Sequence, residues 1–366
     1  MLALNKFSAN QKSIIDKITN QKRLSPNEGI ELFNFDLGVL GILANHINQQ
    51  KNFDKVYFNK NIHIEPTNIC IYDCKFCSYH RKVNQEGSWE YSIEDIIKKV
   101  SEYKNTNLTE IHIVGGVHPK RDLHYYGKMI QEIKKVLPDV HIKAFTAVEL
   151  DFMIKKAHVS LKEGLIQLKE YGLDSIPGGG AEIFEPEIRK QVCHDKSTAD
   201  QWLTIHETAH NVELPSNATI LYGHIENIQH RIGHLDQLRT LQDKTKGFNT
   251  FIPLKFKQAN NSLSYIGEVN TLEVLKMFAI SRIYLDNFDH IKAYWPMLGK
   301  DTSQISLSFG VDDIDGTIDD STKIYSMAGA KDQKPSMSTI DLVELIKDAG
   351  KKPVERDTVY NVIKEY

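Results

Sequence analysis

The chain has 366 residues and carries 45 Lys and Arg against 48 Asp and Glu, which gives a formal net charge of −3 at pH 7. Without an excess of positive charge, it is poorly suited to binding nucleic acid through phosphates. Hydrophobic residues make up 41% and charged residues 25% of the chain, as in ordinary globular proteins. The longest apolar run near the N-terminus, residues 37–44, is too short to span a membrane. We therefore expect a cytoplasmic protein that uses neither nucleic acid nor a membrane as a partner.

The expected elements begin with helices and continue as an alternation of strands and helices. Residues 1–58 read as a helical N-terminal extension, with Ile14, Ile15 and Ile18 on one stripe. From residue 61 onward, short strand-like runs alternate with amphipathic helical segments. The eight expected strands are 62–66, 110–115, 141–146, 174–177, 217–222, 250–255, 290–295 and 305–309.

Eight strands joined by crossover helices are typical of a TIM-type (β/α)8 barrel with parallel strands. We expect this barrel over residues 59–320. The extension, residues 1–58, precedes it, and a helical C-terminal tail, residues 321–366, packs on it. A doubly wound open sheet stays an alternative, because a single misassigned strand would change the topology.

Functional side chains of such a barrel gather at the carboxyl ends of the strands. Along the first strand, His63, Glu65 and Thr67 share one face, and the alternation of the strand turns this face inward. The same reasoning places Lys255, Ser306 and Ser308 inside. Inward polar groups indicate a site, although a buried hydrogen-bond network would also explain them. Candidate site residues lie at or just after the ends of most expected strands: Gly115, Gly116, Glu149, Glu182, His224, Trp295 and Asp312.

Three cysteines lie within eight residues, Cys70, Cys74 and Cys77, and predict a metal centre. Thiolates are soft ligands that suit zinc or an iron–sulfur cluster. A structural zinc site needs a fourth ligand, for which His80 and Cys193 are candidates. Three cysteines on a 4Fe–4S cluster instead leave one iron open, and an open coordination position is what a chemically active metal centre requires.

The C-x3-C-x2-C spacing, with Phe76 before the last cysteine, resembles the signature of the radical S-adenosylmethionine (SAM) superfamily. This resemblance implies a 4Fe–4S cluster, SAM as co-substrate, and a one-electron donor such as flavodoxin or ferredoxin. It also implies that Phe76, Gly115 and Gly116 lie at the SAM site, with the glycines leaving room for the methionyl group. Glu149 and Glu182 are candidates for contacts to the ribose hydroxyls and the amine, although either carboxylate would also be ordinary at a surface.

Seven stretches resemble the aminofutalosine synthase family of the futalosine route to menaquinone: 63–70, 73–79, 112–119, 145–151, 177–184, 248–256 and 293–299. The resemblance implies that a 5′-deoxyadenosyl radical adds to the enolpyruvyl group of 3-[(1-carboxyvinyl)oxy]benzoate, and that decarboxylation gives 6-amino-6-deoxyfutalosine. Because this substrate has two carboxylates, cationic side chains near the strand ends are candidates for binding it. The candidate substrate residues are His63, Thr67, His224, Arg231, Lys255, Trp295 and Asp312.

Two rival functions stay open. Residues 308–317 are similar to the cyclic dehypoxanthine futalosine synthases and the deazaflavin synthases, which are radical SAM enzymes of other specificity. A non-catalytic iron–sulfur or zinc protein would use the cysteines without SAM.

A radical site must exclude competing hydrogen donors, and either the N-terminal extension or the C-terminal tail is a candidate to close it.

A second metal-like motif, His206-Glu-Thr-Ala-His210, matches the H-E-x-x-H pattern of zinc proteases. Its helix is expected to pack outside the barrel through Trp202, Ile205 and Ala209. The third histidine of the extended protease pattern is absent. We therefore interpret the two histidines as structural.

Overall fold

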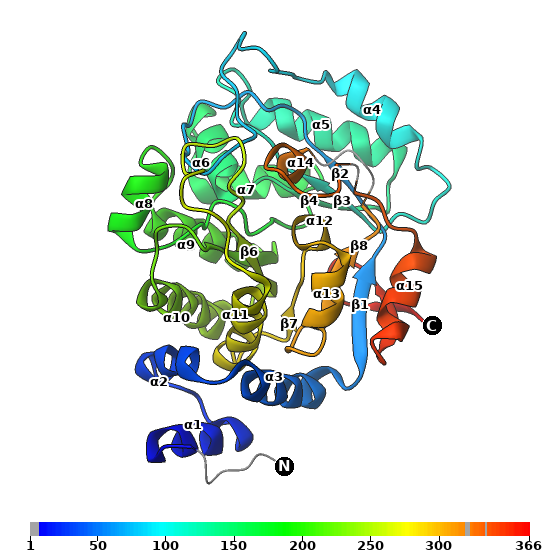
Figure 1. The fold of residues 1–366 in the computed structure, drawn as a ribbon. Helices are drawn as coiled ribbons and strands as arrows, with labels where there is room; N and C mark the ends of the chain where they lie inside the picture. The colour runs from blue at the N-terminus through cyan, green and yellow to red at the C-terminus, as the bar shows by residue number, and fades with distance from the viewer. Residues whose placement is uncertain (1–6, 319–322, 334) are drawn as a thin grey trace.

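The computed structural model describes residues 7–318, 323–333 and 335–366, which form an α/β fold with helices around the strands (Figure 1). The expected domain boundary between residues 320 and 321 lies outside these described residues. In the described part of the chain, no helix has the length and apolar character that crossing a membrane requires.

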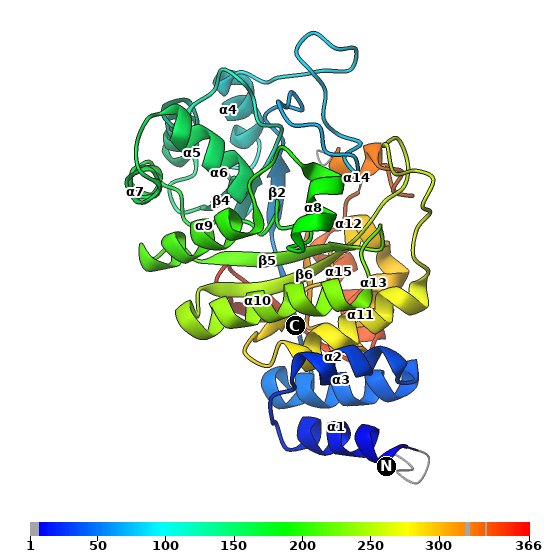
Figure 2. The ribbon, with the colours of Figure 1, turned by 90° about the vertical axis from the view of Figure 1, so that its left-hand side faces the viewer.

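The N-terminal helices lie at the opposite end of the molecule from the loop between β2 and α4, the loop that carries the cysteines (Figures 1 and 2). Ser8 and Ser25 each accept a hydrogen bond from the third residue of the helix that they begin, which satisfies a backbone N–H that would otherwise lack a partner. The third helix packs on α11 (Thr271–Tyr284). The extension therefore does not close the end that carries the cysteines. Its helices are α1 (Ala9–Thr19), α2 (Pro26–Glu31), the 3-10 helix η2 (Leu32–Asn34) and α3 (Leu37–Asn52).

Both termini contribute strands that the sequence analysis did not expect. The extension ends in β1 (Lys55–Asn59), and the tail contains β9 (Lys352–Arg356) and β10 (Val362–Glu365) besides α14 (Ile324–Met327) and α15 (Thr339–Asp348). Strand β1 pairs in parallel with β8 (Asp313–Gly316) and with β9. A purely helical extension and a purely helical tail were therefore wrong. Runs of four or five residues are too short for periodicity to distinguish strand from helix.

The other strands form two parallel sheets. The first has the order β2 (Asn61–Ile64), β3 (Glu110–Ile113) and β4 (His141–Ala144). The second has the order β5 (Ser216–Tyr222), β6 (Phe248–Lys255) and β7 (His290–Ile291). Isolated parallel bridges connect the sheets, through Ser175 to β4, through Ile176 to β5, and from Lys292 to β8. The strands therefore follow one another in space in chain order.

Two expected strands differ in the structure. The fourth, residues 174–177, appears only as the two bridges at Ser175 and Ile176. The eighth was misplaced, because residues 305–309 belong to the end of α13 (Lys300–Ser306) and the turn after it, and the strand is β8. Ser306 donates its hydroxyl to the carbonyl oxygen of Ser303 within this helix, so Ser306 and Ser308 do not lie on an inward strand face. A short apolar run fits a helix as well as a strand.

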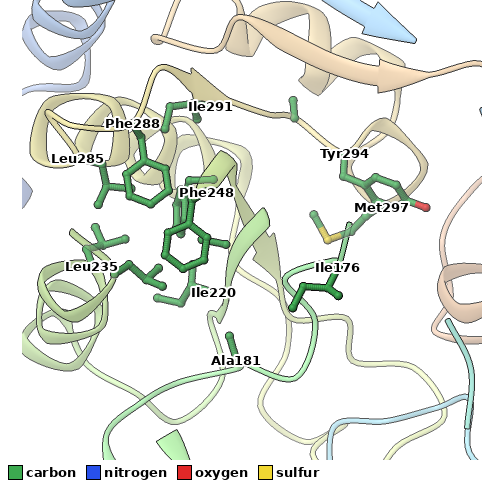
Figure 3. Close-up of a cluster of buried hydrophobic side chains, with 14 of the residues drawn as sticks. Ile176, Ala181, Ile220, Leu235, Phe248, Leu285, Phe288, Ile291, Tyr294 and Met297 are labelled. Atoms are coloured by element: carbon green, nitrogen blue, oxygen red, sulfur yellow. The ribbon is translucent and has the colours of Figure 1, made fainter. Parts of the chain in front are cut away.

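Helices cover the outer faces of the strands and enclose a continuous apolar core. In Figure 3, the rings of Phe288 and Phe248 of β6 lie one above the other, with Leu285 and Leu235 of α10 on the same side of them and Ile220 of β5 below. The two phenylalanine rings stack with centroids 5.6 Å apart. The outer helices are α4 (Ile93–Ser101), α5 (Leu123–Val136), α6 (Ala147–Lys156), α7 (Leu161–Glu170), α8 (Pro186–Cys193), α9 (Ala199–Asn211), α10 (Ile228–Thr245), α11, α12 (Trp295–Leu298) and α13.

Candidate active site

The three clustered cysteines lie on the long loop that follows β2. Cys74 is a buried residue, and Cys70 and Cys77 are partly exposed residues. Burial raises the pKa of all three thiols, and the nearby Lys196 ammonium opposes this rise. The Lys82 ammonium donates hydrogen bonds to the carbonyl oxygens of residues 70, 71 and 72 at 3.0–3.4 Å. Lys82 therefore stabilises the turn that begins at the first cysteine.

The two candidates for a zinc ligand contact other groups. His80 lies 3.1 Å from a carboxylate oxygen of Asp73 and 3.1 Å from the carbonyl oxygen of Cys77. Cys193 is 1% exposed at the end of α8 and packs in a small apolar cluster with Cys74 and Phe256. Among the described residues, no three His, Cys, Asp or Glu side chains are grouped to hold one metal ion.

The glycine pair after β3 packs directly against the start of the cysteine loop. A Cβ atom on Gly115 would lie 2.8 Å from the carbonyl oxygen of Thr67, and one on Gly116 would lie 2.3 Å from that of Ile69. The backbone N–H of Gly116 donates to the Thr67 carbonyl oxygen at 2.7 Å. Glycine is therefore required for close contact between two backbone segments, and not only for the room it leaves for a ligand.

Glu149 stabilises the neighbouring backbone. It is the third residue of α6, and its carboxylate accepts hydrogen bonds from the N–H and hydroxyl of Thr146, both at 2.8 Å, and from the N–H of Gly115 at 3.1 Å. Burial raises its pKa to about 7, although these hydrogen bonds lower it. Glu149 is 5% exposed and does not line the cavity described below. The carboxylate therefore positions Gly115.

Glu182 forms an ion pair with Lys196 at 2.5 Å, and the same ammonium lies 5.2 Å from the centre of the Phe76 ring. Although burial lowers the pKa of Lys196, the nearby Cys74 and Glu182 raise it above its ordinary value. This cation therefore stays charged between the cysteine loop and the wall of the cavity.

A cavity of about 290 Å³ lies at the carboxyl ends of the strands. Of the site residues expected from the sequence, it is lined by His63, Phe76, Cys77, Gly115, Glu182 and Lys255. His63 stacks on His112 at 4.6 Å and on Tyr294 at 6.0 Å. Lys255 and Lys257 both contact the same oxygen of Glu268, at 2.8 and 2.9 Å. Two cations thus share one carboxylate at the wall, which leaves one positive charge in excess.

Five expected substrate residues do not line this cavity. Thr67 is buried within the cysteine loop and donates to the carbonyl oxygen of Trp89, and Trp295 donates to that of Gly316. His224 and Arg231 both contact Glu226, and Arg231 also contacts Glu273. The Arg231 cation is therefore directed to carboxylates of the protein itself, and burial lowers the pKa of the His224 imidazole beside Glu226.

Asp312 lies at the opposite end of the strands. It immediately precedes β8, where its carboxylate pairs with Arg282 and with His290 at the start of β7. The sequence analysis placed Asp312 after the eighth strand because it assigned that strand to residues 305–309. The eighth strand is β8 (Asp313–Gly316), so Asp312 lies before the strand and not after it.

The structure adds inward residues that the sequence analysis missed. Lys143 of β4 pairs with Glu110 at 2.6 Å, and Lys292 pairs with Asp315 of β8 at 2.7 Å. Lys143, Lys292 and Asp315 line the cavity, as do Asn217, Thr219 and Tyr325. The alternation that placed His63 inside would have identified Lys143. Asp315 required the correct position of the last strand.

The chain is similar to known proteins over most of its length. The family named Radical SAM superfamily matches residues 64–238, and the CofH/MqnC C-terminal region matches residues 245–365. An aminodeoxyfutalosine synthase from Thermus thermophilus is 41% identical over 96% of this chain and 95% of its own length. The chain belongs to the aminodeoxyfutalosine synthase family of radical SAM proteins.

A second member of this family, from Streptomyces coelicolor, is 38% identical over 97% of the chain and 95% of its own length. A crystal structure of methylornithine synthase is similar with a TM-score of 0.74 and 17% identity, over 93% of this chain and 97% of that one. At this identity, the likeness concerns the fold alone.

The residues at the cavity suit the cluster that radical SAM proteins carry. The donor set is three thiols on one loop, which is the ligand chemistry of iron–sulfur clusters. Cys77 lines the cavity, so a group bound there would face the space available to a substrate. The H-E-x-x-H pair lies elsewhere, since His206 and His210 of α9 both contact the hydroxyl of Ser216, at 2.8 and 2.7 Å. These two histidines are structural.

Proposed function

We propose that this chain is a radical SAM transferase that makes 6-amino-6-deoxyfutalosine in menaquinone biosynthesis. Its substrates would be SAM and 3-[(1-carboxyvinyl)oxy]benzoate, and the 5′-deoxyadenosyl group would add to the enolpyruvyl carbon with loss of carbon dioxide. The observation that carries this proposal is the identity of 38–41% to two aminodeoxyfutalosine synthases over nearly the whole of each chain.

Cys70, Cys74 and Cys77 would hold a 4Fe–4S cluster, which supplies the electron that cleaves SAM. The protein's own contribution is to position the reactants. Phe76, Gly115 and Glu182 line the cavity beside Cys77 and would contact SAM. Gly116 and Glu149 would act indirectly, because they hold the backbone of the cysteine loop and of Gly115.

A substrate with two carboxylates needs cations, and the cavity wall supplies them. Lys255 and Lys257 share the carboxylate of Glu268 and have one positive charge in excess. His63 lies deeper, in a stack with His112 and Tyr294, where a flat aromatic ring would be accommodated. These two groups would orient the enolpyruvyl carbon toward the adenosyl group.

The parallel order of the strands supports a (β/α)8 barrel, with the bridges at Ser175, Ile176 and Lys292 completing the sequence of strands. We assign the barrel to residues 59–320, between the extension 1–58 and the tail 321–366. A cytoplasmic enzyme of this kind would take its electron from a flavodoxin or ferredoxin.

The test is anaerobic reconstitution with iron and sulfide, reduction, and incubation with SAM and 3-[(1-carboxyvinyl)oxy]benzoate. Mass analysis should detect 6-amino-6-deoxyfutalosine and methionine, and a Cys77→Ala variant is the control for the cluster. Dehypoxanthine futalosine, the substrate of the related cyclases, is supplied in a parallel reaction. Conversion of this compound alone would assign the chain to the cyclases. SAM left intact by a loaded 4Fe–4S cluster would favour a non-catalytic iron–sulfur protein.

A further inference from the structure

One wall of the cavity comes from the C-terminal tail. We call residues 323–330, which include α14, the flap. Ile324, Tyr325 and Ala328 of the flap line the cavity, and the Tyr325 ring lies 5.1 Å from that of Tyr294. Figure 1 shows α14 at the end of the molecule where the loop after β2 also lies. The flap therefore separates the cavity from solvent on this side.

A single buried carboxylate binds the start of the flap. Glu65 follows β2 and is 5% exposed. Its two oxygens accept hydrogen bonds from the backbone N–H of Lys323, each at 3.0 Å, and one also accepts from the N–H of Ile324 at 3.2 Å. These contacts join residues 258 positions apart in the chain. Because β2 also carries His63, the carboxylate connects the flap to the strand that lines the cavity.

The other contacts of the flap are weaker or peripheral. The Lys323 ammonium lies 4.6 Å from the centre of the Trp89 ring, and the Asn260 amide donates to the carbonyl oxygen of Met327 at 2.8 Å. Hydrogen bonds to an ionised carboxylate are stronger than a hydrogen bond between neutral groups such as that of Asn260. Burying a carboxylate is costly unless hydrogen bonds compensate, so Glu65 favours the arrangement in which both N–H groups reach it.

We propose that Glu65 is a positioning residue that holds the flap over the cavity, so that Ile324 and Tyr325 keep external hydrogen-atom donors away from the adenosyl radical. This inference rests on the proposed function. With the flap displaced, a thiol of the buffer would reach the radical. The S–H bond would break, its hydrogen atom would form a C–H bond at the 5′ carbon, and a thiyl radical and 5′-deoxyadenosine would result. Each such event would consume one SAM without adenosyl transfer.

The test uses Glu65→Gln, in which an amide N–H group faces the two backbone donors. The matched control is Glu163→Gln, since Glu163 also accepts a hydrogen bond from a backbone N–H, that of Ser160 at 3.0 Å, but at an exposed position of α7. Reactions contain the reconstituted enzyme, SAM, substrate and a thiol in D2O. Burial raises the pKa of Glu65 to about 7, so the assay is run near pH 8, where the wild-type carboxylate is ionised.

We expect Glu65→Gln to raise the ratio of 5′-deoxyadenosine to adenosylated product about tenfold, the factor that loss of one hydrogen bond to a charged group typically causes. The 5′-deoxyadenosine should carry one deuterium from the exchanged thiol. Hydrogen exchange at the amides of Lys323 and Ile324 should also accelerate. The control should leave the ratio and the exchange unchanged.

Wild-type values of the ratio and of amide exchange in Glu65→Gln would overturn the inference. If this variant does not fold, Tyr325→Ala replaces it and trims the flap without touching Glu65, and an unchanged product ratio would again count against the inference. The two proposals fail separately. A wild-type enzyme that makes no adenosylated product contradicts the proposed function, whereas amide exchange tests the attachment of the flap independently of turnover.

Discussion

The Glu182 carboxylate and the Lys196 ammonium form an ion pair at 2.5 Å, with side chains only 14% and 11% exposed. Because Lys196 also lies over the Phe76 ring, the pair connects a cavity-lining loop to the cysteine loop. A buried ion pair of this kind is sensitive to the loss of either partner, since the remaining charge has no compensation.

We therefore expect Lys196→Met to lower the free energy of unfolding by about 3 kcal/mol, measured by urea denaturation. The double variant Lys196→Met/Glu182→Gln should recover much of this loss, because it leaves no unpaired buried charge. A double variant as unstable as the single one would show that the lysine stabilises the fold by packing and not by pairing.

The contact between the glycine pair and the cysteine loop gives a second prediction. Gly116→Ala should displace the loop, because its Cβ atom would lie 2.3 Å from the Ile69 carbonyl oxygen. The amount of iron bound per chain after reconstitution should fall severalfold. Gly233→Ala is the control: it lies in α10 with nothing within 4 Å of its Cβ position, and should stabilise the helix by about 0.5–1 kcal/mol. Equal iron content in both variants would contradict this prediction.

The cavity-lining lysine gives a third prediction. Lys255→Met should raise the KM for the dicarboxylate substrate about tenfold, because a charge-assisted hydrogen bond to a carboxylate is lost. Arg231→Lys is the comparison, since Arg231 pairs with Glu226 and Glu273 outside the cavity, and its KM should stay near that of the wild type. Steady-state kinetics of both variants measure the two KM values. A raised KM in Arg231→Lys together with an unchanged KM in Lys255→Met would place Arg231, and not Lys255, at the substrate site.

The buried histidines of α9 give a prediction about pH. Burial lowers the pKa of His210 from 6.5 to about 4, so between these values the unfolded chain binds more protons than the folded one. His210 therefore lowers the free energy of unfolding as the pH falls from about 6.5 to 4, by at most about 1.4 kcal/mol per pH unit. Above pH 6.5 the free energy of unfolding is not reduced by the protonation of His210.

His210→Gln has no such titration, and its free energy of unfolding should decline less steeply than that of the wild type across this window. Urea denaturation of both proteins at pH 7, 6, 5 and 4.5 measures the difference. Because the carboxyl groups titrate equally in both proteins, only the difference between the two curves is informative. Parallel curves would mean that the pKa of His210 is the same in the folded and the unfolded chain, which would contradict the prediction.

Much of the candidate site could be predicted from the sequence because its signals are local. Cys70, Cys74 and Cys77 lie on one short segment, and the two glycines at the end of the second expected strand lie on another. The residue types and their spacing in each segment can be recognised without knowing which other segments lie beside it. Six of the eight expected strands overlap β2 to β7 for the same reason, since their alternation or length is visible within a few residues. The eighth failed at residues 305–309, where a short apolar run fits either kind of element.

The sequence by itself determined the local signals on which the proposed chemistry rests: a three-cysteine loop, a glycine pair and the resemblance to a family. Only the tertiary structure decided which charged residues reach the cavity. His224 and Arg231 are as polar as Lys255, but both contact the Glu226 carboxylate, and Arg231 also contacts Glu273, 42 residues away in the chain; no local pattern shows that the two side chains lie outside the cavity. Glu65 and the start of the flap are 258 residues apart in the chain. Their contact therefore exists only once the chain has folded.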